Sequence, residues 1–326
     1  MKISHQLCDN HESITSAIAK LSNANILFID CEGKDLGSQG GTLSTLGLGI
    51  YNSPDGYYNS REGELTIYIV DVLAFQRPCS GSLDNKHANA QPDLLRSIFD
   101  LLASSVVLKI GFDLRMDASE LLHGYGVRLT CVLDLQVADV VSRTGEDEVR
   151  PLQRLMGRFL PAQEILGNRE LYKKVVKLNG LDGALMDQGI KTIPKKRVDH
   201  SRWMLRPLSE RYVSYAAEDI CLIYSLYTAI RDNGKVSLMD AVARSEGYIQ
   251  YHASCRPSKD DIYQRHGLMP LDEHGDLDTK RTRLCAGCKR RLSSSQFPSL
   301  KSGVGIAYCF VCYAVNRRGK LREKRK

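Results

Sequence analysis

The sequence predicts a mixed α/β fold with a central sheet flanked by helices, followed by a small C-terminal module that binds zinc. Two observations predict the sheet: strand-like stretches follow one another early in the chain, and strands and helices alternate after them. A third observation predicts the module, namely four cysteines in metal-ligand spacing. They are Cys285, Cys288, Cys309 and Cys312.

The predicted strands fall in the first third of the chain. Residues 26–32 (ILFIDCE) are apolar on both alternating faces until their carboxylates, a pattern typical of a central strand that is covered on both sides. Further strands are expected at residues 43–51, 65–72 and 106–110, separated by polar loops. This succession predicts a mixed sheet.

The predicted helices flank these strands. They are expected up to residue 24, at residues 92–103 and 117–123, and, with the longest and clearest pattern, at residues 209–231. In the first of these helices, four apolar residues share one helical face: Ile14, Ala17, Ile18 and Leu21.

The apolar pattern also indicates where domains end. It thins out after residue 254, and the next stretch carries Pro, Asp, His and Gly without sustained periodicity. We therefore predict one domain at residues 1–254, a linker at 255–280 and a basic zinc-finger module at 281–326.

Composition excludes several classes of protein. The chain has 326 residues, of which 43% are hydrophobic and 25% charged, within the range of soluble globular proteins. No stretch approaches 18 consecutive apolar residues, so the sequence predicts no membrane span. The first twenty residues lack the pattern of a secretory signal. We expect an intracellular protein of the nucleus, the cytoplasm or both, and not a secreted one.

The charge is unevenly distributed. Residues 280–326 hold fourteen basic residues and one acidic residue, Glu323, which leaves 31 basic and 37 acidic residues in the rest of the chain. A short basic segment attached to a mildly acidic body predicts nucleic acid or another polyanion as the partner. The alternative is a nuclear-import signal or a solvated tail.

Two carboxylates end the predicted central strand. Asp30 and Glu32 are two residues apart, so both side chains project from one face of the strand. Unpaired carboxylates there would repel each other and lose hydration, and a divalent cation removes both penalties. The alternative is that the strand ends at Asp30 and that the two acids are solvated in a turn.

A further acid lies on the longest predicted helix. Tyr215 and Asp219 are one helical turn apart, on a face that also carries apolar residues, so the sequence predicts that both point inward. A phenol and a carboxylate in that position need partners. The alternative is a Tyr–Asp pair on the surface.

Three stretches together resemble the motifs of the DEDDy 3′–5′ exonucleases, the group of ribonuclease D, the Werner-syndrome exonuclease domain and Egalitarian-like proteins. They are residues 26–33 (ILFIDCEG), 109–121 (KIGFDLRMDASEL) and 206–219 (RPLSERYVSYAAED). The resemblance spans roughly residues 20–235 and implies a ribonuclease H-like fold. A related subclass has histidine five residues before the last aspartate; Ser214 at that position indicates the tyrosine subclass.

The resemblance implies a site for two Mg²⁺ or Mn²⁺ ions, for which hard carboxylate oxygens are suited. Asp30 would contact both ions, Glu32 and Asp219 the ion that activates water, and Asp117 the second ion through water. Tyr215 would orient the attacking water. Paired ions of this kind supply a nucleophile and neutralise the departing oxygen in phosphodiester hydrolysis.

Two aspartates compete for the role in the second motif. The acid of the family stands eight residues after the lysine that ends the preceding strand, and counting from Lys109 selects Asp117. Asp113 is then expected to cap or position the helix. The usual histidine-containing stretch of the family is Gly111-Phe112 here, which is a departure from its pattern.

The cysteine module has a pattern of its own. Two C-x-x-C pairs separated by twenty residues can form knuckles that direct four thiolates at one tetrahedral Zn²⁺. A piece this small has little core, so the metal would supply much of its stability. Its aromatic residues are expected either to stack on bases or to form its core: Phe297, Tyr308, Phe310 and Tyr313.

Basic residues near the third motif and in the module are candidate contacts to a nucleic-acid backbone, with a solvated surface as the alternative. These candidates are Lys195, Lys196, Arg197, Arg202, Lys289, Arg290, Arg291, Arg317 and Arg318. The only tryptophan, Trp203, is expected in the core.

Taken together, the sequence predicts a 3′–5′ exonuclease that hydrolyses single-stranded RNA or DNA from its 3′ end and releases nucleoside 5′-monophosphates. Two Mg²⁺ or Mn²⁺ ions would serve its catalysis, and one Zn²⁺ would be structural. The alternative is a catalytically inactive, exonuclease-like protein that binds nucleic acid or serves as a scaffold.

Overall fold

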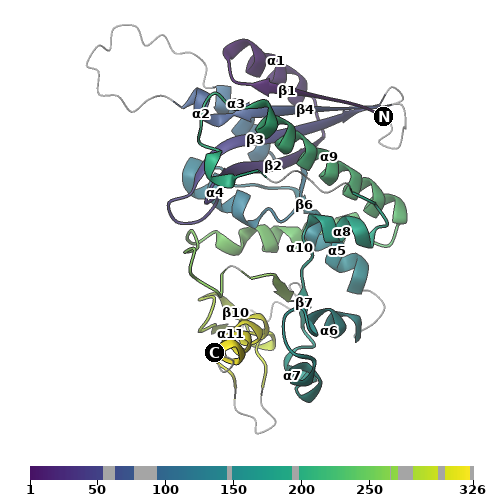
Figure 1. The fold of residues 1–326 in the computed structure, drawn as a ribbon, viewed down its shortest axis with the longest axis vertical. Coiled ribbons are helices and arrows are strands. Elements are labelled where there is room, and N and C mark those ends of the chain that lie inside the picture. The colour runs from purple at the N-terminus through teal and green to yellow at the C-terminus, as the bar shows by residue number, and fades with distance from the viewer. Residues whose placement is uncertain are drawn as a thin grey trace, which may run out of the picture. The chain divides into compact units, whose positions relative to one another are not determined.

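The computed structural model describes residues 1–53, 63–76, 94–144, 149–192, 198–264, 266–270, 282–299 and 305–323. The chain forms two compact units, and Figure 1 labels most of their helices and strands. Unit 1 comprises Met1–Val137 and Leu181–Arg256, and unit 2 comprises Ala138–Gly180 and Pro257–Lys326. Among the described residues no helix has the length and apolar character needed to cross a membrane.

A mixed sheet of six strands forms the centre of unit 1, in the order β1-β4-β3-β2-β5-β6. Strands β2, β3 and β4 are antiparallel neighbours, whereas β1, β5 and β6 run parallel to the strands they join. The predicted mixed α/β sheet is confirmed. The strands are β1 (Lys2–Cys8), β2 (Ile26–Lys34), β3 (Thr42–Asn52), β4 (Glu64–Asp71), β5 (Leu108–Gly111) and β6 (Val132–Asp134).

Helices cover both faces of this sheet (Figure 1). The residues of β2 alternate between the faces: Leu27, Ile29 and Cys31 join a core that includes side chains of α1, α3 and α4. Phe28 instead packs edge-on against Tyr224 and Tyr227 of α9. The bounds of these helices are α1 (His11–Leu21), α3 (Leu94–Ala103), α4 (Arg115–Tyr125) and α9 (Glu210–Asn233).

Local sequence accounts for the ends of these helices. Asn10 and Ser13 form a reciprocal capping box at the start of α1. Helix α4 ends at Gly126 and α9 at Gly234, both in the left-handed conformation that glycine adopts readily. The other helices of unit 1 are α2 (Val72–Phe75), α8 (Leu181–Asp187) and α10 (Leu238–Ile249), while α5 (Leu135–Thr144) begins in unit 1 and ends in unit 2.

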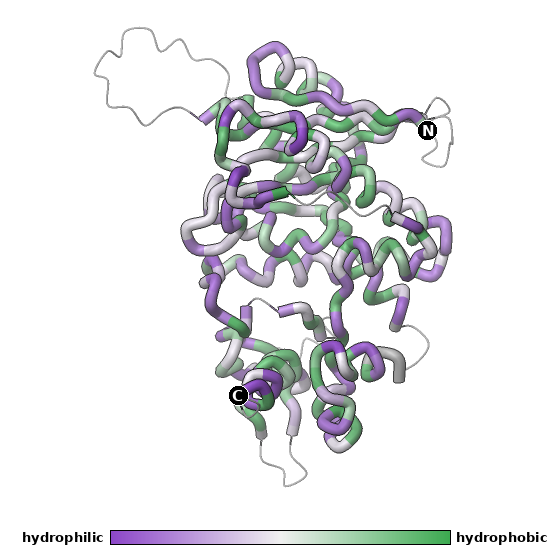
Figure 2. Tube along the Cα trace, in the orientation of Figure 1, coloured by the Kyte–Doolittle hydropathy of each residue, from purple (hydrophilic) through white to green (hydrophobic). Residues whose placement is uncertain are grey.

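The prediction of a helix up to residue 24 is wrong at its start. Residues Lys2–Cys8 form β1, an edge strand that pairs in parallel with β4, and the helix begins only at His11. Figure 2 shows why the strand gives a weak signal: most of its residues are hydrophilic, and hydrophobic ones do not alternate regularly. An edge strand of a sheet has few buried positions to reveal it.

Unit 2 combines a middle segment of the chain with the C-terminal residues. Strand β8 (Leu268–Pro270) lies inside the predicted linker and pairs antiparallel with β7 (Val175–Lys177). The predicted domain limits remain a prediction, because a compact unit need not be a segment that folds alone. The other elements are α6 (Val149–Leu155), α7 (Ala162–Gly167), β9 (Thr282–Leu284), β10 (Arg291–Ser293) and α11 (Phe310–Glu323).

Candidate functional site

Three of the four predicted carboxylates meet on the α9 side of the sheet. Asp30 and Glu32 belong to β2, and Asp219 belongs to α9. One oxygen of each lies within 4.8 Å of the others, and all three residues are half-buried. Carboxylate oxygens gathered in this way, with partial access to solvent, suit a hard divalent cation. The donor set therefore fits the predicted metal.

Two glycines of β3 bring α9 close enough to the sheet for this meeting. Gly47 and Gly49 lie opposite Asp30 and Phe28 in the strand pairing, and Ile220 of α9 rests on both glycines. A β-carbon at Gly49 would stand 2.6 Å from Cγ2 of Ile220. Because Ile220 follows Asp219 directly, the absence of side chains at these positions helps to set the place of that carboxylate.

Asp117 is joined to the same stretch of β2 by a hydrogen bond. It lies in the first turn of α4, and its Oδ1 accepts the backbone N–H of Cys31, between the two acids of β2, at 3.0 Å. Its side chain is not among those whose ligand atoms gather within 4.8 Å. Burial raises the pKa of the Asp117 carboxyl to about 7, although the bond to Cys31 opposes this shift.

Asp113, the competing acid of the second motif, is engaged elsewhere. Both of its oxygens accept bonds from Arg115, at 2.6 and 2.9 Å, and Oδ1 also accepts the hydroxyl of Tyr248. Its backbone N–H donates to Asp134, whose carboxylate also accepts the N–H of Leu114 at the start of α4. These contacts fix the turn that leads into α4, as expected of a positioning residue.

Tyr215 lies one turn before Asp219 on α9. Burial raises the pKa of its phenol above the ordinary value, and the negative charges of Asp219 and Glu32 raise it further. The phenol is therefore protonated at neutral pH and able to donate a hydrogen bond. Trp203 is fully buried and lies edge-on to Tyr215, which confirms its predicted core role.

Sequence reasoning missed one neighbour of this site, His200. Its Nδ1 lies 3.8 Å from Oε2 of Glu32, and its ring lies edge-on to that of Tyr215. The indole N–H of Trp203 donates to the same Nδ1 at 3.4 Å. No ligand spacing in the sequence marks His200, because only the folded chain brings it to the end of β2.

The segment before α9 is anchored to the sheet by Arg206. Its guanidinium contacts Asp71, which is almost completely buried, at 2.6 and 2.7 Å and also donates to Oγ of Ser44. The hydroxyl of Ser44 in turn donates to the carbonyl of Trp203 at 2.6 Å. These bonds hold the beginning of the third motif against β3 and β4.

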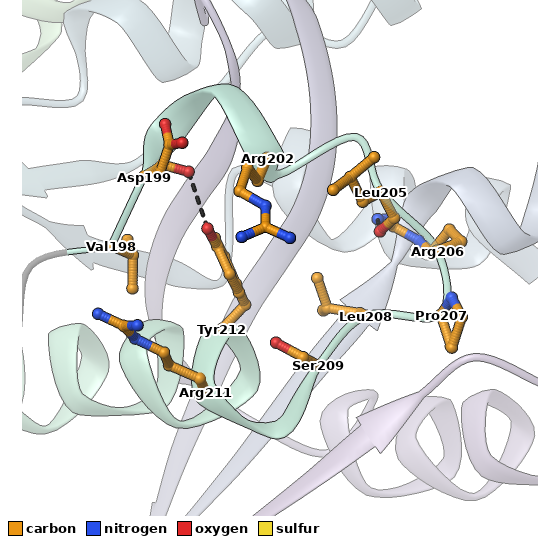
Figure 3. A pocket seen from close by; sticks show the side chains of 10 residues that line it. All are labelled: Val198, Asp199, Arg202, Leu205, Arg206, Pro207, Leu208, Ser209, Arg211 and Tyr212. Carbon is orange, nitrogen blue, oxygen red and sulfur yellow. Dashed lines mark hydrogen bonds between the residues drawn. The ribbon is translucent and has the colours of Figure 1, made fainter.

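A pocket of about 610 Å³ lies beside this segment (Figure 3). Arg202, a predicted nucleic-acid contact, lines it together with Arg206 and Arg211. Tyr212 closes one side, its hydroxyl donating to the carbonyl oxygen of Asp199 at 2.9 Å. The three neighbouring candidates, Lys195, Lys196 and Arg197, lie outside the described residues.

The four module cysteines gather in unit 2. Their sulfurs lie within 4.8 Å of one another, and all four residues are buried. Zinc–sulfur bonds of about 2.3 Å would separate tetrahedral sulfurs by about 3.8 Å, so the cluster fits one zinc ion. Backbone N–H groups of Cys309 and Cys312 donate to sulfurs of Cys285 and Cys309, a contact that favours thiolates.

The aromatic residues of this region form its core and its internal contacts. Phe297 and Phe310 are buried, and Arg283 lies over the ring of Phe297 at 4.4 Å. Tyr308 stacks on Tyr263, with ring centroids 5.7 Å apart. For the two phenylalanines, the core alternative is therefore the one observed.

The candidate backbone contacts of unit 2 have different surroundings. Arg317 forms a double hydrogen bond with Glu164 of α7, at 2.9 and 2.7 Å, whereas Arg318 lies over the ring of Phe159 at 4.3 Å. Lys289 and Arg291 are exposed beside the cysteines, and Arg290 is partly buried there. Arg317 and Arg318 are adjacent in the sequence, but only Arg317 has its charge neutralised by a carboxylate in these contacts.

A mixed sheet covered by helices, with acids of β2 and α9 meeting on one face, is the arrangement of a ribonuclease H-like exonuclease fold. The comparison with family models agrees: residues 6–235 match the 3′–5′ exonuclease domain. The chain belongs to this 3′–5′ exonuclease family, and the resemblance to its DEDDy members is confirmed.

Solved structures of RNase D from Trypanosoma brucei have the same fold. RNase D of Trypanosoma brucei superimposes with a TM-score of 0.52 at 18% identity, covering 78% of this chain and 74% of that one. The complex of the same protein with RNA U12 gives 0.52 at 20% identity, covering 79% and 73%. RNase D of Escherichia coli gives 0.45 at 14% identity, covering 79% and 52%. No curated protein sequence matches the chain.

Proposed function

We propose that this chain is a two-metal-ion-dependent exonuclease that shortens single-stranded RNA or DNA from the 3′ end and releases nucleoside 5′-monophosphates. One observation carries the proposal: oxygens of Asp30, Glu32 and Asp219 lie within 4.8 Å of one another in a chain of this family. A protein that only binds nucleic acid would gain nothing from this concentration of like charge.

Asp30, Glu32 and Asp219 would hold the divalent cations, with Asp117 contributing from the start of α4. When bound, such ions supply a nucleophilic water at neutral pH and neutralise charge on the departing 3′-oxygen. The hydrogen bond from Cys31 to Asp117 ties the first and second motifs together. It therefore supports the assignment of Asp117, and not Asp113, as the acid of the second motif.

Tyr215 would act as a hydrogen-bond donor. Its raised pKa makes proton abstraction by a phenolate unfavourable, so the phenol would orient the attacking water or a phosphate oxygen. Trp203 and His200 pack against its ring and restrict its position. Restriction of this kind is how an active site keeps a donor aligned with the reacting group.

The zinc ion would be structural. Four buried cysteines would complete a tetrahedral shell, leaving no position for a substrate. As for the polymer, the solved relatives are named ribonucleases and one of them is in complex with RNA. RNA is therefore the first substrate to test.

The test uses single strands of RNA and DNA of equal length, labelled at either end and incubated with Mg²⁺, with Mn²⁺ or without divalent ions. We expect 5′-labelled strands to give a ladder that shortens with time, and 3′-labelled strands to release labelled mononucleotide at once. Asp30→Asn should abolish the ladder, whereas Glu218→Gln should leave it unchanged. Glu218 is an exposed carboxylate directly before Asp219, so it controls for charge.

Two results would refute the proposal. Shortening that needs no divalent ion, or that persists in Asp30→Asn, contradicts the two-ion mechanism. Binding of both polymers without shortening under any metal condition would instead favour an exonuclease-like scaffold.

A further inference from the structure

Unit 2 contains a basic pocket that the carboxylate site does not explain. Its volume is about 340 Å³, and it is lined by Gly157, Arg158, Phe159, Leu160 and Pro161 on one side. Arg318, Leu321 and Arg322 of α11 complete it. Three of the eight lining residues are arginines and none is acidic, so the lining is positively charged.

Arg318 is held in place for binding. Its guanidinium lies 4.3 Å from the ring centroid of Phe159, a residue that is 9% exposed. Stacking on a largely buried ring orients the plane of the guanidinium, and a stacked guanidinium can still donate from its N–H edges. A preoriented donor of this kind loses little entropy when it binds an anion.

Arg317, on the same helix, is by contrast neutralised by a carboxylate. Its two bonds to Glu164 join α11 to α7, and Glu164 also accepts the hydroxyl of Tyr172. The pKa of Glu164 is lowered chiefly by Arg317. Arg317 therefore has a structural role, and the pocket arginine beside it, Arg318, does not share that partner.

Like charges also accumulate around the pocket. Burial lowers the pKa of Lys177, and nearby positive charges lower it further, with Arg158 first among them and Arg318 also contributing. Burial also lowers the pKa of Arg318, with a contribution from Arg322. Cations that disfavour one another's charge gain most from an anion that binds between them.

We propose that this basic pocket binds the phosphodiester backbone of single-stranded nucleic acid, with Arg158, Arg318 and Arg322 contacting phosphates. Arginine forks match phosphate oxygens in geometry as well as in charge. The choice of nucleic acid over other polyanions rests on the proposed function, because an exonuclease needs to hold the strand that it shortens. The pocket would give the substrate a point of attachment outside the carboxylate site.

The test measures binding apart from cleavage. Fluorescent oligouridylate and oligothymidylate of about twelve nucleotides are titrated with the whole protein, zinc-loaded and without added Mg²⁺ or Mn²⁺. The variant Arg158→Ala/Arg322→Ala removes two exposed cations from the pocket. We expect affinity to fall about tenfold near 0.1 M salt, and the slope of log Kd against log salt to decrease by about 1.4, for two lost phosphate contacts.

A matched variant separates this site from general charge. Arg169→Ala/Lys320→Ala also removes two exposed cations of unit 2, one from its middle segment (Ala138–Gly180) and one from α11. Neither residue lines the pocket. We expect less than a twofold loss of affinity. An equal loss in both variants, or none in the pocket variant, would overturn the proposal. So would displacement of the oligonucleotides by polyglutamate of equal charge, because it would identify an acidic protein as the preferred ligand.

The outcome is distinguishable from the fate of the proposed function. Pocket-dependent binding by a protein that never shortens a strand supports this inference and refutes the nuclease assignment. Metal-dependent shortening, with binding unchanged in the pocket variant, supports the nuclease assignment and refutes this inference. Circular dichroism and zinc content show whether each variant is folded.

Discussion

Among the described residues, two clusters of side chains could hold a metal ion, and they differ in burial. The cysteine cluster of unit 2 consists of four soft ligands, all buried, which would complete the shell of a zinc ion. The carboxylate cluster of unit 1 consists of three hard ligands, all half-buried, which would leave positions for water and substrate. On the proposed function, the first arrangement would serve folding and the second would serve chemistry. Loss of each cluster should therefore have a different consequence.

The largest expected effect is the loss of structure in unit 2 when the zinc shell is broken. Cys309→Ser removes one thiolate from a region that has little other core, and zinc binding contributes on the order of 10 kcal/mol in small domains. We expect zinc content to fall and α11 to become sensitive to limited proteolysis. Cys255→Ser, at an exposed cysteine outside the cluster, should change neither. Normal protease resistance without zinc would contradict this role.

Next in size is the effect of removing a carboxylate from the other cluster. Asp219→Asn should lower kcat/KM by at least about 10³-fold, since the cation loses a ligand and its charge is less well neutralised. The melting temperature should not fall, because mutual repulsion of the acids is relieved at the same time. A variant that loses activity only in proportion to a loss of folded protein would point to a structural role for Asp219.

The two aspartates of the second motif should also differ, one affecting activity and the other stability. Asp117→Asn is expected to lower kcat by about 10²-fold with little change in stability. Asp113→Asn should instead destabilise the protein by about 2 kcal/mol, because it leaves Arg115, which is largely buried, without its ion-pair partner. Denaturant unfolding and single-turnover cleavage of both variants test this assignment, and the reverse pattern would make Asp113 the acid of the motif.

A smaller effect is expected when α9 is displaced from the sheet. Gly49→Ala places a methyl group against Ile220 and should lower kcat about tenfold, with a stability cost of about 1–3 kcal/mol. Gly167→Ala is a matched control, because nothing lies within 4 Å of the added carbon. Unchanged cleavage by Gly49→Ala would show that the approach of α9 does not determine the position of Asp219.

The smallest effect concerns the ion pair between Arg317 and Glu164. Arg317 is 36% and Glu164 9% exposed at their side chains, so solvent screens the pair only in part. A double-mutant cycle with both residues changed to Ala should give a coupling energy of about 1 kcal/mol in the unfolding of unit 2. A coupling near zero would mean that Arg317 is as available for anions as Arg318.

The sequence predicted the parts of the fold that depend on buried patterns. Strands β2, β3 and β4 and helix α9 were predicted within two residues at each end, because continuous apolar stretches and the 3.6-residue period are local signals. Strand β1 escaped detection because a polar edge strand depends on its partner β4. Strand β8 was not predicted for a similar reason, because its three residues form a strand only by pairing with β7.

The residues of the candidate site that belong to a sequence motif could be predicted. Residues that only tertiary contacts bring to the site could not. Asp30, Glu32 and Asp219 were found from their spacing together with the resemblance to the exonuclease motifs, and the structure brings them together. His200 could not be found, because its place beside Glu32 results from the fold of a segment without periodicity. Arg317 and Arg318 are equivalent in the sequence, and only Glu164 and Phe159 distinguish them.

The most direct test of the central claim is anomalous diffraction from crystals of the whole chain soaked in Mn²⁺. We expect manganese density with oxygens of Asp30, Glu32 and Asp219 about 2.0–2.2 Å away, and zinc density only among the four cysteines. Manganese bound elsewhere, with these three carboxylates turned away from one another, would contradict the account.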